Sequence, residues 1–256
     1  MAGSSERTIL WHLAMSHYNE KARWALDFKR VPHTRRAVMP GVHQFVARHL
    51  SGGTTMPLLQ HDGQTFGDSS EIVRALELLQ PEPPLYPADP HLRRRALELE
   101  QQFDTILAPA MRKVLYQEAL FRREFAADVL SVGGPPLRRT LTARMLPLMA
   151  PIMRRTFDVP DRDDPGPRDT VRDQVAQIGQ LAAATGFLVG DSFTVADLAA
   201  CSFLIPFVDT AAMSAEMPSL PEPLAVFGHE IAATPGGEWV AAIWSEWRRA
   251  PRGQLG

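Results

Sequence analysis

The sequence predicts two folded units, an α/β domain with a mixed four-stranded sheet followed by an all-helical domain. Short β-like segments alternate with helical patterns over the first 80 residues, whereas the pattern from residue 91 onward is helical. Between them, the stretch QPEPPLYPADP contains five prolines in eleven residues. Because proline interrupts helices and central strands, we interpret residues 81–90 as a linker between the two domains.

The first domain, residues 1–80, is expected to have the order β-α-β-α-β-β-α, with residues 1–7 disordered. TILWHLA predicts a strand, residues 17–29 a helix, TRRAVM a second strand and HQFVARHL a short helix. MPLLQHDGQTFG predicts a hairpin that turns at Asp62 and Gly63, and residues 69–79 predict the last helix. Crossover helices between the strands predict a mixed sheet that is covered by helices.

The second domain, residues 91–256, is predicted to be helical throughout. Apolar residues at spacings of three and four predict a long first helix that is kinked at Pro109, and further helices at 136–157 and 168–184. FTVADLAACSFLIPFV is apolar on all sides, which predicts a buried helix. Two more helices are expected near residues 223–233 and 236–249.

Composition excludes several classes of function. The 256 residues include 27 basic and 29 acidic side chains, a net charge of −2, so no field of one sign is available for nucleic acid or an anionic membrane. No apolar run reaches the roughly 18 residues of a membrane span, and the first residues do not resemble a secretion signal, so we expect a cytoplasmic protein. The histidines lack the spacing of metal ligands, and we expect no metal. Cys201, the single cysteine, cannot form an internal disulfide and is expected to be an inert core thiol.

Ser16 lies where the first strand gives way to the first helix, and two interpretations compete for its hydroxyl. In the simpler one, the hydroxyl caps the helix by accepting a hydrogen bond from the Asn19 backbone, which stabilises a helix by about 1 kcal/mol. In the other, the hydroxyl, the free N–H groups and the positive end of the helix dipole together hold an anion.

Two further stretches carry similar ambiguity. Pro57 begins a strand and is either an ordinary trans proline at an edge or a cis proline after Met56. Asp68, followed by Ser69 and Ser70, precedes a helix, and Glu71 stands three residues later, as in a capping box. Helix initiation explains this pattern, and the same helix end could also hold a carboxylate.

Taken in register, these stretches resemble the glutathione S-transferase family. The pattern S-x-Y-x-x-K-A-R-W-A-L at 16–26, MP at 56–57, DSS at 68–70 and FTVADLAA at 193–200 follow that family's order and approximate spacing. The resemblance extends over nearly the whole chain. It implies a thioredoxin-like N-terminal domain, a helical C-terminal domain, a homodimer, and glutathione as substrate or cosubstrate in detoxification.

The resemblance also implies roles for individual residues. Ser16 matches the hydroxyl that donates to the glutathione sulfur in serine-using members of the family. Met56 and Pro57 match the residues that hold the cysteinyl part, and Asp68 and Ser69 match the pair that holds the γ-glutamyl end. Thr194 and Asp197 match a buried capping box with Phe193 beside it, and are expected to be structural.

A hydrophobic electrophile would bind between the domains, in a pocket where we expect the side chains of Met15, His17, Met111, Leu115 and Tyr116. Core packing explains these residues equally well. Tyr18 is a second candidate for the activating hydroxyl.

One position departs from the pattern of some relatives. Thr55 stands where they have a lysine, so Arg36, Arg48 or His49 is expected to meet the glycyl carboxylate, unless glutathione binds weakly or another small thiol replaces it.

Three functions fit these expectations. The first is transfer of a thiol to a hydrophobic electrophile. The second is an isomerase or dehalogenase of the same fold that uses the thiol as a cofactor. The third is a non-catalytic protein that binds a ligand or a partner.

Overall fold

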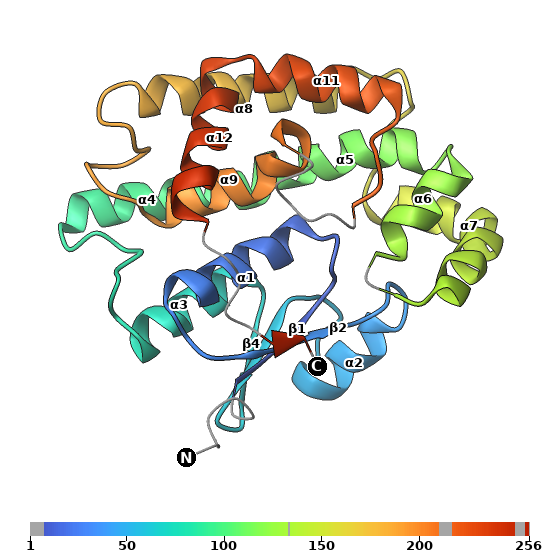
Figure 1. The fold of residues 1–256 in the computed structure, drawn as a ribbon, viewed down its shortest axis with the longest axis horizontal. Helices are drawn as coiled ribbons and strands as arrows, with labels where there is room; N and C mark the ends of the chain where they lie inside the picture. The colour runs from blue at the N-terminus through green and yellow to red at the C-terminus, as the bar shows by residue number, and fades with distance from the viewer. Residues whose placement is uncertain (1–7, 133, 210–216, 249–253, 256) are drawn as a thin grey trace.

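The computed structural model describes residues 8–132, 134–209, 217–248 and 254–255. The expectation that residues 1–7 are disordered lies outside this part of the chain. Figure 1 shows a small sheet with its own helices on one side of the molecule and a larger group of helices on the other. The chain therefore has an α/β domain followed by a helical domain, which confirms the predicted fold class.

The N-terminal sheet is mixed, as predicted. Strand β1 (Thr8–His12) lies at its centre, parallel to β2 (Thr34–Ala37) and antiparallel to β3 (Leu58–His61), and β3 pairs in turn with β4 (Gln64–Gly67). Leu10 and Leu59 face each other across β1 and β3, and neither is exposed to solvent. This apolar register fixes how the central strands pair.

The β3–β4 hairpin turns at the two residues that the sequence predicts. Asp62 and Gly63 have φ angles of 46° and 83°. A two-residue turn with positive φ at both positions matches the twist of the strands it joins, and an aspartate followed by glycine suits it.

The sheet has one strand that the sequence analysis placed in the helical domain. Gln254–Leu255 forms β5, which pairs in parallel with β2 and makes the order β4-β3-β1-β2-β5. Without it, β2 would be an edge strand with unpaired backbone groups, and the end of the chain supplies partners for them. Among the described residues from 91 onward, every regular element other than this short strand is a helix.

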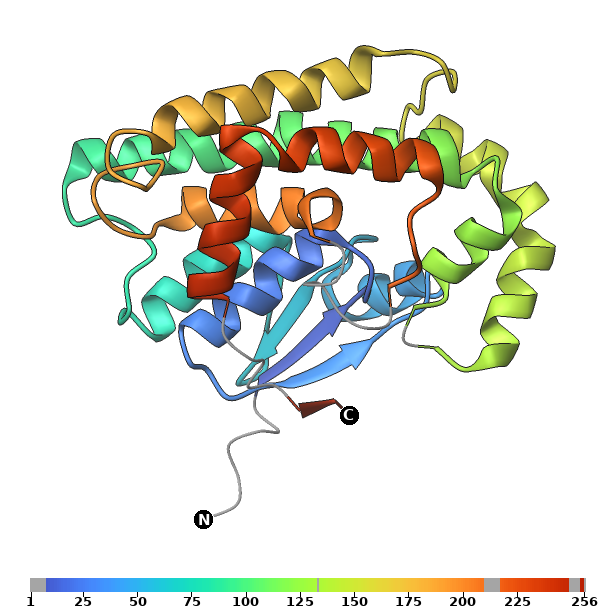
Figure 2. The same ribbon diagram turned by 45° about the horizontal axis from the view of Figure 1, so that its top comes forward.

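Three helices belong to the N-terminal domain: α1 (His17–Phe28), α2 (His43–Ser51) and α3 (Ser69–Leu79). Figure 2 shows α1 and α3 between the sheet and the helical domain. Helix α1 is buried over most of its length, because it packs on α3 on one side and on α9 of the helical domain on another. Its amino end is therefore held between the two domains.

The helical domain begins with a long helix in three segments and continues with six more helices in the described residues. The bounds are α4 (Pro90–Gln102), η2 (Phe103–Leu107), α5 (Ala108–Ala119), α6 (Arg123–Leu130), α7 (Pro136–Thr156), α8 (Gly166–Ala182), α9 (Val195–Val208), α11 (Glu222–Ala232) and α12 (Pro235–Trp247).

The middle segment, η2, is a turn of π-helix and stands where the sequence predicts a proline kink. The Ala108 N–H donates to the Phe103 carbonyl, five residues back. The next residue, Pro109, has no N–H, so the Asp104 carbonyl has no partner within the helix. It accepts a hydrogen bond from the Tyr18 hydroxyl at 2.7 Å instead.

Buried ion pairs fasten α1 to both domains. Lys21 has no exposed side-chain surface, and its ammonium lies 2.8 Å from carboxylate oxygens of Glu100 and of Asp104. It also donates to the Ser70 hydroxyl at 2.9 Å. One lysine thereby joins α1, α3 and the first helix of the helical domain.

Helix α9 forms the centre of the helical domain and is buried on all sides, as its sequence predicts. Thr194 and Asp197 form the expected capping box, and Phe193 stacks on Trp247 with ring centroids 5.0 Å apart. The Asp197 carboxylate accepts hydrogen bonds from the Thr194 and Leu188 backbone N–H groups, both at 2.8 Å. Among the described residues, no helix is long and apolar enough to cross a membrane.

Candidate active site

The amino end of α1 presents the Ser16 hydroxyl without using it as a cap. Ser16 has the extended backbone of an N-cap residue, but its side chain makes no cap hydrogen bond. The Asn19 side chain instead reaches back and accepts from the Leu13 N–H at 2.9 Å. The interpretation of Ser16 as an ordinary capping serine is therefore wrong, and its hydroxyl is available to a ligand at the positive end of the helix dipole.

The Tyr18 hydroxyl, the second candidate, already donates a hydrogen bond within the protein. It donates to the Asp104 carbonyl that the π-helical turn leaves free, and burial raises its pKa to about 12. A phenol that donates to a backbone oxygen has no second proton for a sulfur atom. Ser16 is thus the better placed of the two hydroxyls.

The loop before β3 contains the Met56–Pro57 peptide bond, which is cis. The ordinary trans geometry, which base rates favour, is not found here. Met56 is nearly buried, with 9% of its surface exposed, and Thr55 precedes it at the edge of the same cavity as Ser16.

The amino end of α3 is built as a reciprocal cap. The Asp68 carboxylate accepts from the Glu71 N–H at 2.8 Å, and the Glu71 carboxylate accepts from the Gly67 N–H at 2.8 Å. Ser69 is buried, and the Ser70 hydroxyl donates to Asp104 at 2.6 Å. The helix start is thereby held rigidly against the helical domain.

Two adjoining cavities meet beside these helix ends. A cavity of about 200 Å³ is lined mainly by apolar side chains and includes Ser16, Thr55 and Met56. A second, the polar cavity of about 730 Å³, is lined by residues most of which are polar or charged, and includes Asp68, Ser69 and Pro57. Both are lined by Tyr18, Thr55, Met56 and Arg112.

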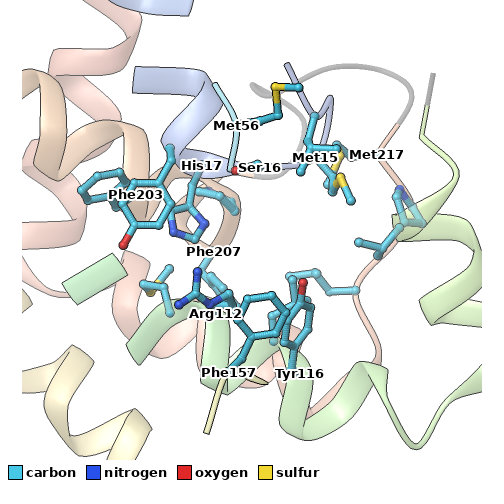
Figure 3. A pocket seen from close by; sticks show the side chains of 18 of the residues that line it. Met15, Ser16, His17, Met56, Arg112, Tyr116, Phe157, Phe203, Phe207 and Met217 are labelled. Atoms are coloured by element: carbon cyan, nitrogen blue, oxygen red, sulfur yellow. The ribbon is translucent and has the colours of Figure 1, made fainter. Parts of the chain in front are cut away.

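The apolar cavity brings together all five side chains that the sequence placed in the electrophile pocket: Met15, His17, Met111, Leu115 and Tyr116. Figure 3 shows Met15, Ser16 and Met56 along one side and Tyr116, Phe157 and Arg112 along the opposite side. Several lining residues were missed by the sequence analysis, namely His43, Arg112, Val129, Phe157, Phe203, Phe207 and Met217. Phe203 and Phe207 stand four residues apart on α9, so their shared helix face was readable. Phe157 follows the last residue of α7, at the end of the helix predicted for residues 136–157, and Met217 lies between helices and gave no periodic signal.

His17 is uncharged at neutral pH. Burial, with the positive charge of Arg112 as the second cause, lowers its pKa to about 3. Its Nε2 atom is buried without a hydrogen-bond partner, and its ring packs edge-on against Phe203. A neutral imidazole with so low a pKa is a poor base for a thiol near pH 7.

Arg112 is the cation between the two cavities. Its guanidinium carbon lies 4.5 Å from the centre of the Phe157 ring, and its Nε atom is buried without an acceptor. An unsatisfied buried donor costs about 1–3 kcal/mol, and more when it is charged. No carboxylate of the described residues pairs with Arg112. The acids that line the polar cavity have other partners. Glu100 and Asp104 pair with Lys21, and Asp68 caps α3.

The residues expected to meet a glycyl carboxylate line neither cavity. These are Arg36, Arg48 and His49, and Arg36 lies over the Trp11 ring with its guanidinium carbon 5.1 Å from the ring centre. The apolar cavity is lined by His17, His43 and Arg112, and burial lowers the pKa of both histidines.

Cys201 lies on α9, where burial raises the pKa of its thiol well above the ordinary value. A thiol in this state is unreactive, which is how the sequence analysis interpreted it. Across the residues the structure describes, no three His, Cys, Asp or Glu side chains gather in a way that could hold a metal ion.

Comparison with known proteins finds one matching family model and many solved structures of similar fold. Residues 10–84 match the family model described as glutathione S-transferase, N-terminal domain. No curated protein matches the sequence significantly.

Solved structures of similar fold include a glutathione S-transferase from Ceriporiopsis subvermispora in complex with glutathione, with 16% identity and a TM-score of 0.65 over 95% of this chain and 98% of that one. A glutathione S-transferase from Methylobacterium radiotolerans, in complex with glutathione sulfonate, has 22% identity and a TM-score of 0.53 over 91% and 93%. The β-etherase LigF from Sphingobium has 17% identity and a TM-score of 0.59 over 92% and 99%. At these identities the likeness establishes the fold.

Proposed function

Because this chain has the glutathione S-transferase fold and carries that family's N-terminal domain at residues 10–84, we propose that it activates a small thiol, glutathione or a related molecule, for attack on a hydrophobic electrophile. The observation that carries the proposal is the uncapped Ser16 hydroxyl at the amino end of α1. Ser16 lines the apolar cavity, and the adjoining polar cavity is lined by residues at the start of α3.

In the proposed arrangement the thiol spans both cavities. Its γ-glutamyl end binds at the start of α3, where Asp68 attracts the ammonium group and the free N–H groups attract the carboxylate. Its cysteinyl part lies along Met56 and Pro57, and its sulfur reaches Ser16. The electrophile then occupies the apolar cavity beside Met15, His17 and Tyr116.

The energies required are modest. A free thiol has a pKa near 8.5, so about 3% is ionised at pH 7, and lowering the pKa by two units takes about 2.7 kcal/mol. A hydrogen bond to the sulfur anion supplies about 1.5–3 kcal/mol and a helix amino end about 0.3–1 kcal/mol. Ser16 and α1 together are therefore sufficient, and the chemistry needs no metal ion.

The reaction is a displacement or an addition. The sulfur anion forms a bond to an electrophilic carbon, and either a leaving group departs with the bonding electron pair or a conjugated system takes up the pair and a proton from water. Lowering the pKa raises the ionised fraction about 25-fold, while the lower basicity reduces nucleophilicity roughly 6- to 10-fold. Holding the two reactants together must therefore supply most of the acceleration.

Ser16→Ala tests this proposal. We expect the rate of thiol conjugation at pH 7 to fall about 2.5- to 4-fold from the loss of ionisation alone, and part of it to return above about pH 8.5, where the free thiol ionises unaided. The measurement is kcat/KM for the thiol between pH 6 and 9.5. Ser16→Thr, which keeps a hydroxyl, is the matched control and retains the wild-type profile. Equal rates for wild type and Ser16→Ala over this range would remove Ser16 from the mechanism.

Two other functions are separated by product analysis. An isomerase of the same fold regenerates the thiol, and a reductive dehalogenase oxidises it together with a second thiol to a disulfide. A transferase leaves it covalently attached to product, and mass spectrometry distinguishes these three fates. A binding protein shows affinity for the thiol in calorimetry and no turnover. A homodimer, a role in detoxification and a cytoplasmic location remain predictions from the resemblance, and sedimentation of the purified chain tests the first of them.

A further inference from the structure

Arg112 carries a positive charge that no carboxylate of the described residues pairs with, and it lines a cavity of mostly apolar side chains. Arginine stays charged in proteins, so its charge cannot be relieved by losing a proton. Around it lie Phe157, His17 and the tyrosines Tyr18 and Tyr116. All are uncharged at neutral pH, because burial lowers the pKa of His17 to about 3 and raises those of both tyrosines. None of them balances the guanidinium charge.

The contact with Phe157 fixes the guanidinium and leaves hydrogen-bond donors free. A guanidinium over an aromatic face is held by cation–π attraction, which uses its flat face and not its N–H edge. The buried Nε atom has no acceptor in the part of the chain that the structure describes. The fork of donors that arginine offers to a carboxylate is therefore unoccupied on a side chain that lines both cavities.

The position of Arg112 indicates which substrate supplies the anion. Phe157, its ring partner, lines the apolar cavity and is absent from the lining of the polar one. Figure 3 shows Arg112 and Phe157 across this cavity from Ser16 and Met56. A molecule that reacts beside Ser16 and extends over the apolar lining therefore ends at Arg112.

We propose that the electrophile is a hydrophobic molecule that carries a carboxylate remote from its reactive carbon, and that the Arg112 guanidinium binds this carboxylate. The inference rests on the proposed thiol transferase function and narrows its substrate class. The carboxylate pairs with Arg112, the apolar body fills the cavity, and the reactive carbon is directed toward the sulfur at Ser16.

A matched pair of substrates tests the proposal: 4-(chloromethyl)benzoate and 4-(chloromethyl)benzamide. In both, the thiol sulfur forms a bond to the benzylic carbon and chloride leaves with the bonding pair, so only the remote group differs. Each rate is divided by the uncatalysed rate with the same thiol. We expect the wild-type kcat/KM to favour the carboxylate by about 10- to 100-fold, as for a charge-assisted pair.

Three variants assign the preference to Arg112. Arg112→Met abolishes it, so that the kcat/KM for the carboxylate falls to about that for the amide. Arg112→Lys keeps the positive charge but lacks the paired N–H donors of the guanidinium, and it retains part of the preference. Arg154→Met is the matched control, because Arg154 also lies over a phenylalanine ring, Phe121, yet lines neither cavity. It keeps the wild-type preference.

The outcomes separate this inference from the function on which it rests. Turnover of both substrates without a preference for the carboxylate overturns the inference alone. If Arg112→Met raises the KM for the thiol and keeps the preference, Arg112 binds the thiol's own carboxylate and the inference is wrong. If the thiol neither binds nor reacts, the proposed function fails, and calorimetry with two unreactive ligands then tests the role of Arg112. Tighter binding of 4-methylbenzoate than of 4-methylbenzamide, with the difference lost in Arg112→Met, supports the carboxylate site. Equal binding of the two ligands overturns it.

Discussion

Asp68 caps α3 with one carboxylate oxygen, Oδ1, which accepts the hydrogen bond from the Glu71 N–H. The proposed thiol site asks the same side chain to attract an ammonium group. Substituting Asp68 therefore changes helix stability and ligand binding together, and two variants are needed to separate them.

Asp68→Asn keeps an oxygen that can cap the helix but removes the negative charge, whereas Asp68→Ala removes both. We expect both variants to raise the KM for the thiol about 10-fold or more with little change in kcat, as for a ground-state contact. Only Asp68→Ala should also lower the free energy of unfolding, by about 1 kcal/mol. Steady-state kinetics and urea denaturation measure the two effects. An unaltered KM in both would place the thiol's ammonium elsewhere.

Some residues of the candidate site could be predicted and others could not, for physical reasons. Ser16, Asp68 and Met56 stand at the junctions of strands and helices, where sequence signals for caps and turns are strong. Arg112 is half-buried and stands beside Lys113 on α5, and a charged residue on a helix is normally solvated, so nothing in the sequence marked it as a cavity residue. Only the cavity and the missing acceptor identify it.

At the scale of elements, Lys21 is the lysine through which α1, α3 and the start of the helical domain meet. Lys21→Met leaves the buried Glu100 and the half-buried Asp104 without their cation, and we expect it to lower the free energy of unfolding by about 3–5 kcal/mol. Lys113→Met is the control, because Lys113 pairs with the exposed Asp158 and such a pair contributes at most about 1 kcal/mol. Urea denaturation measures both. Equal losses in the two variants would mean that the buried cluster does not hold the domains together.

Most elements could be predicted because they depend on local patterns. The hairpin at Asp62 and Gly63 and the capped helix α9 follow from turn and capping residues. The π-helical turn at Phe103–Leu107 could not, because its apolar spacing hardly differs from that of an α-helix. Strand β5 has two residues, too few for any period, and it forms only because β2 offers an edge.

The whole molecule should lose stability in mild acid, and His12 is one cause. It is 4% exposed, and burial, together with the charges of Arg23 and Arg35, lowers its pKa from 6.5 to about 3. Between about pH 6.5 and pH 3, the unfolded chain therefore binds a proton at His12 that the folded chain does not bind. The stabilisation is complete above about pH 6.5 and is lost as the pH falls toward 3.

At pH 5 the loss from His12 is about 2 kcal/mol relative to pH 7, and His17, with a similar pKa, adds a comparable amount. Urea denaturation at pH 7 and pH 5 measures the difference. His12→Gln should reduce it by about half, since the glutamine oxygen can still accept the hydrogen bond that Arg23 donates to the His12 Nδ1 atom at 2.9 Å but cannot titrate. A pH dependence as steep as that of wild type would show that His12 is protonated in the folded protein.

Helix α1 has Ser16 at its amino end, and the rest of its length packs against α3 and α9. Because these contacts join the two domains along the helix, we expect reactants to bind without a hinge motion between the domains. The substrates then bind to a site that is already formed. Differences in kcat/KM among electrophiles would reflect how well each one is positioned in the cavity, and not the rate of a domain closure.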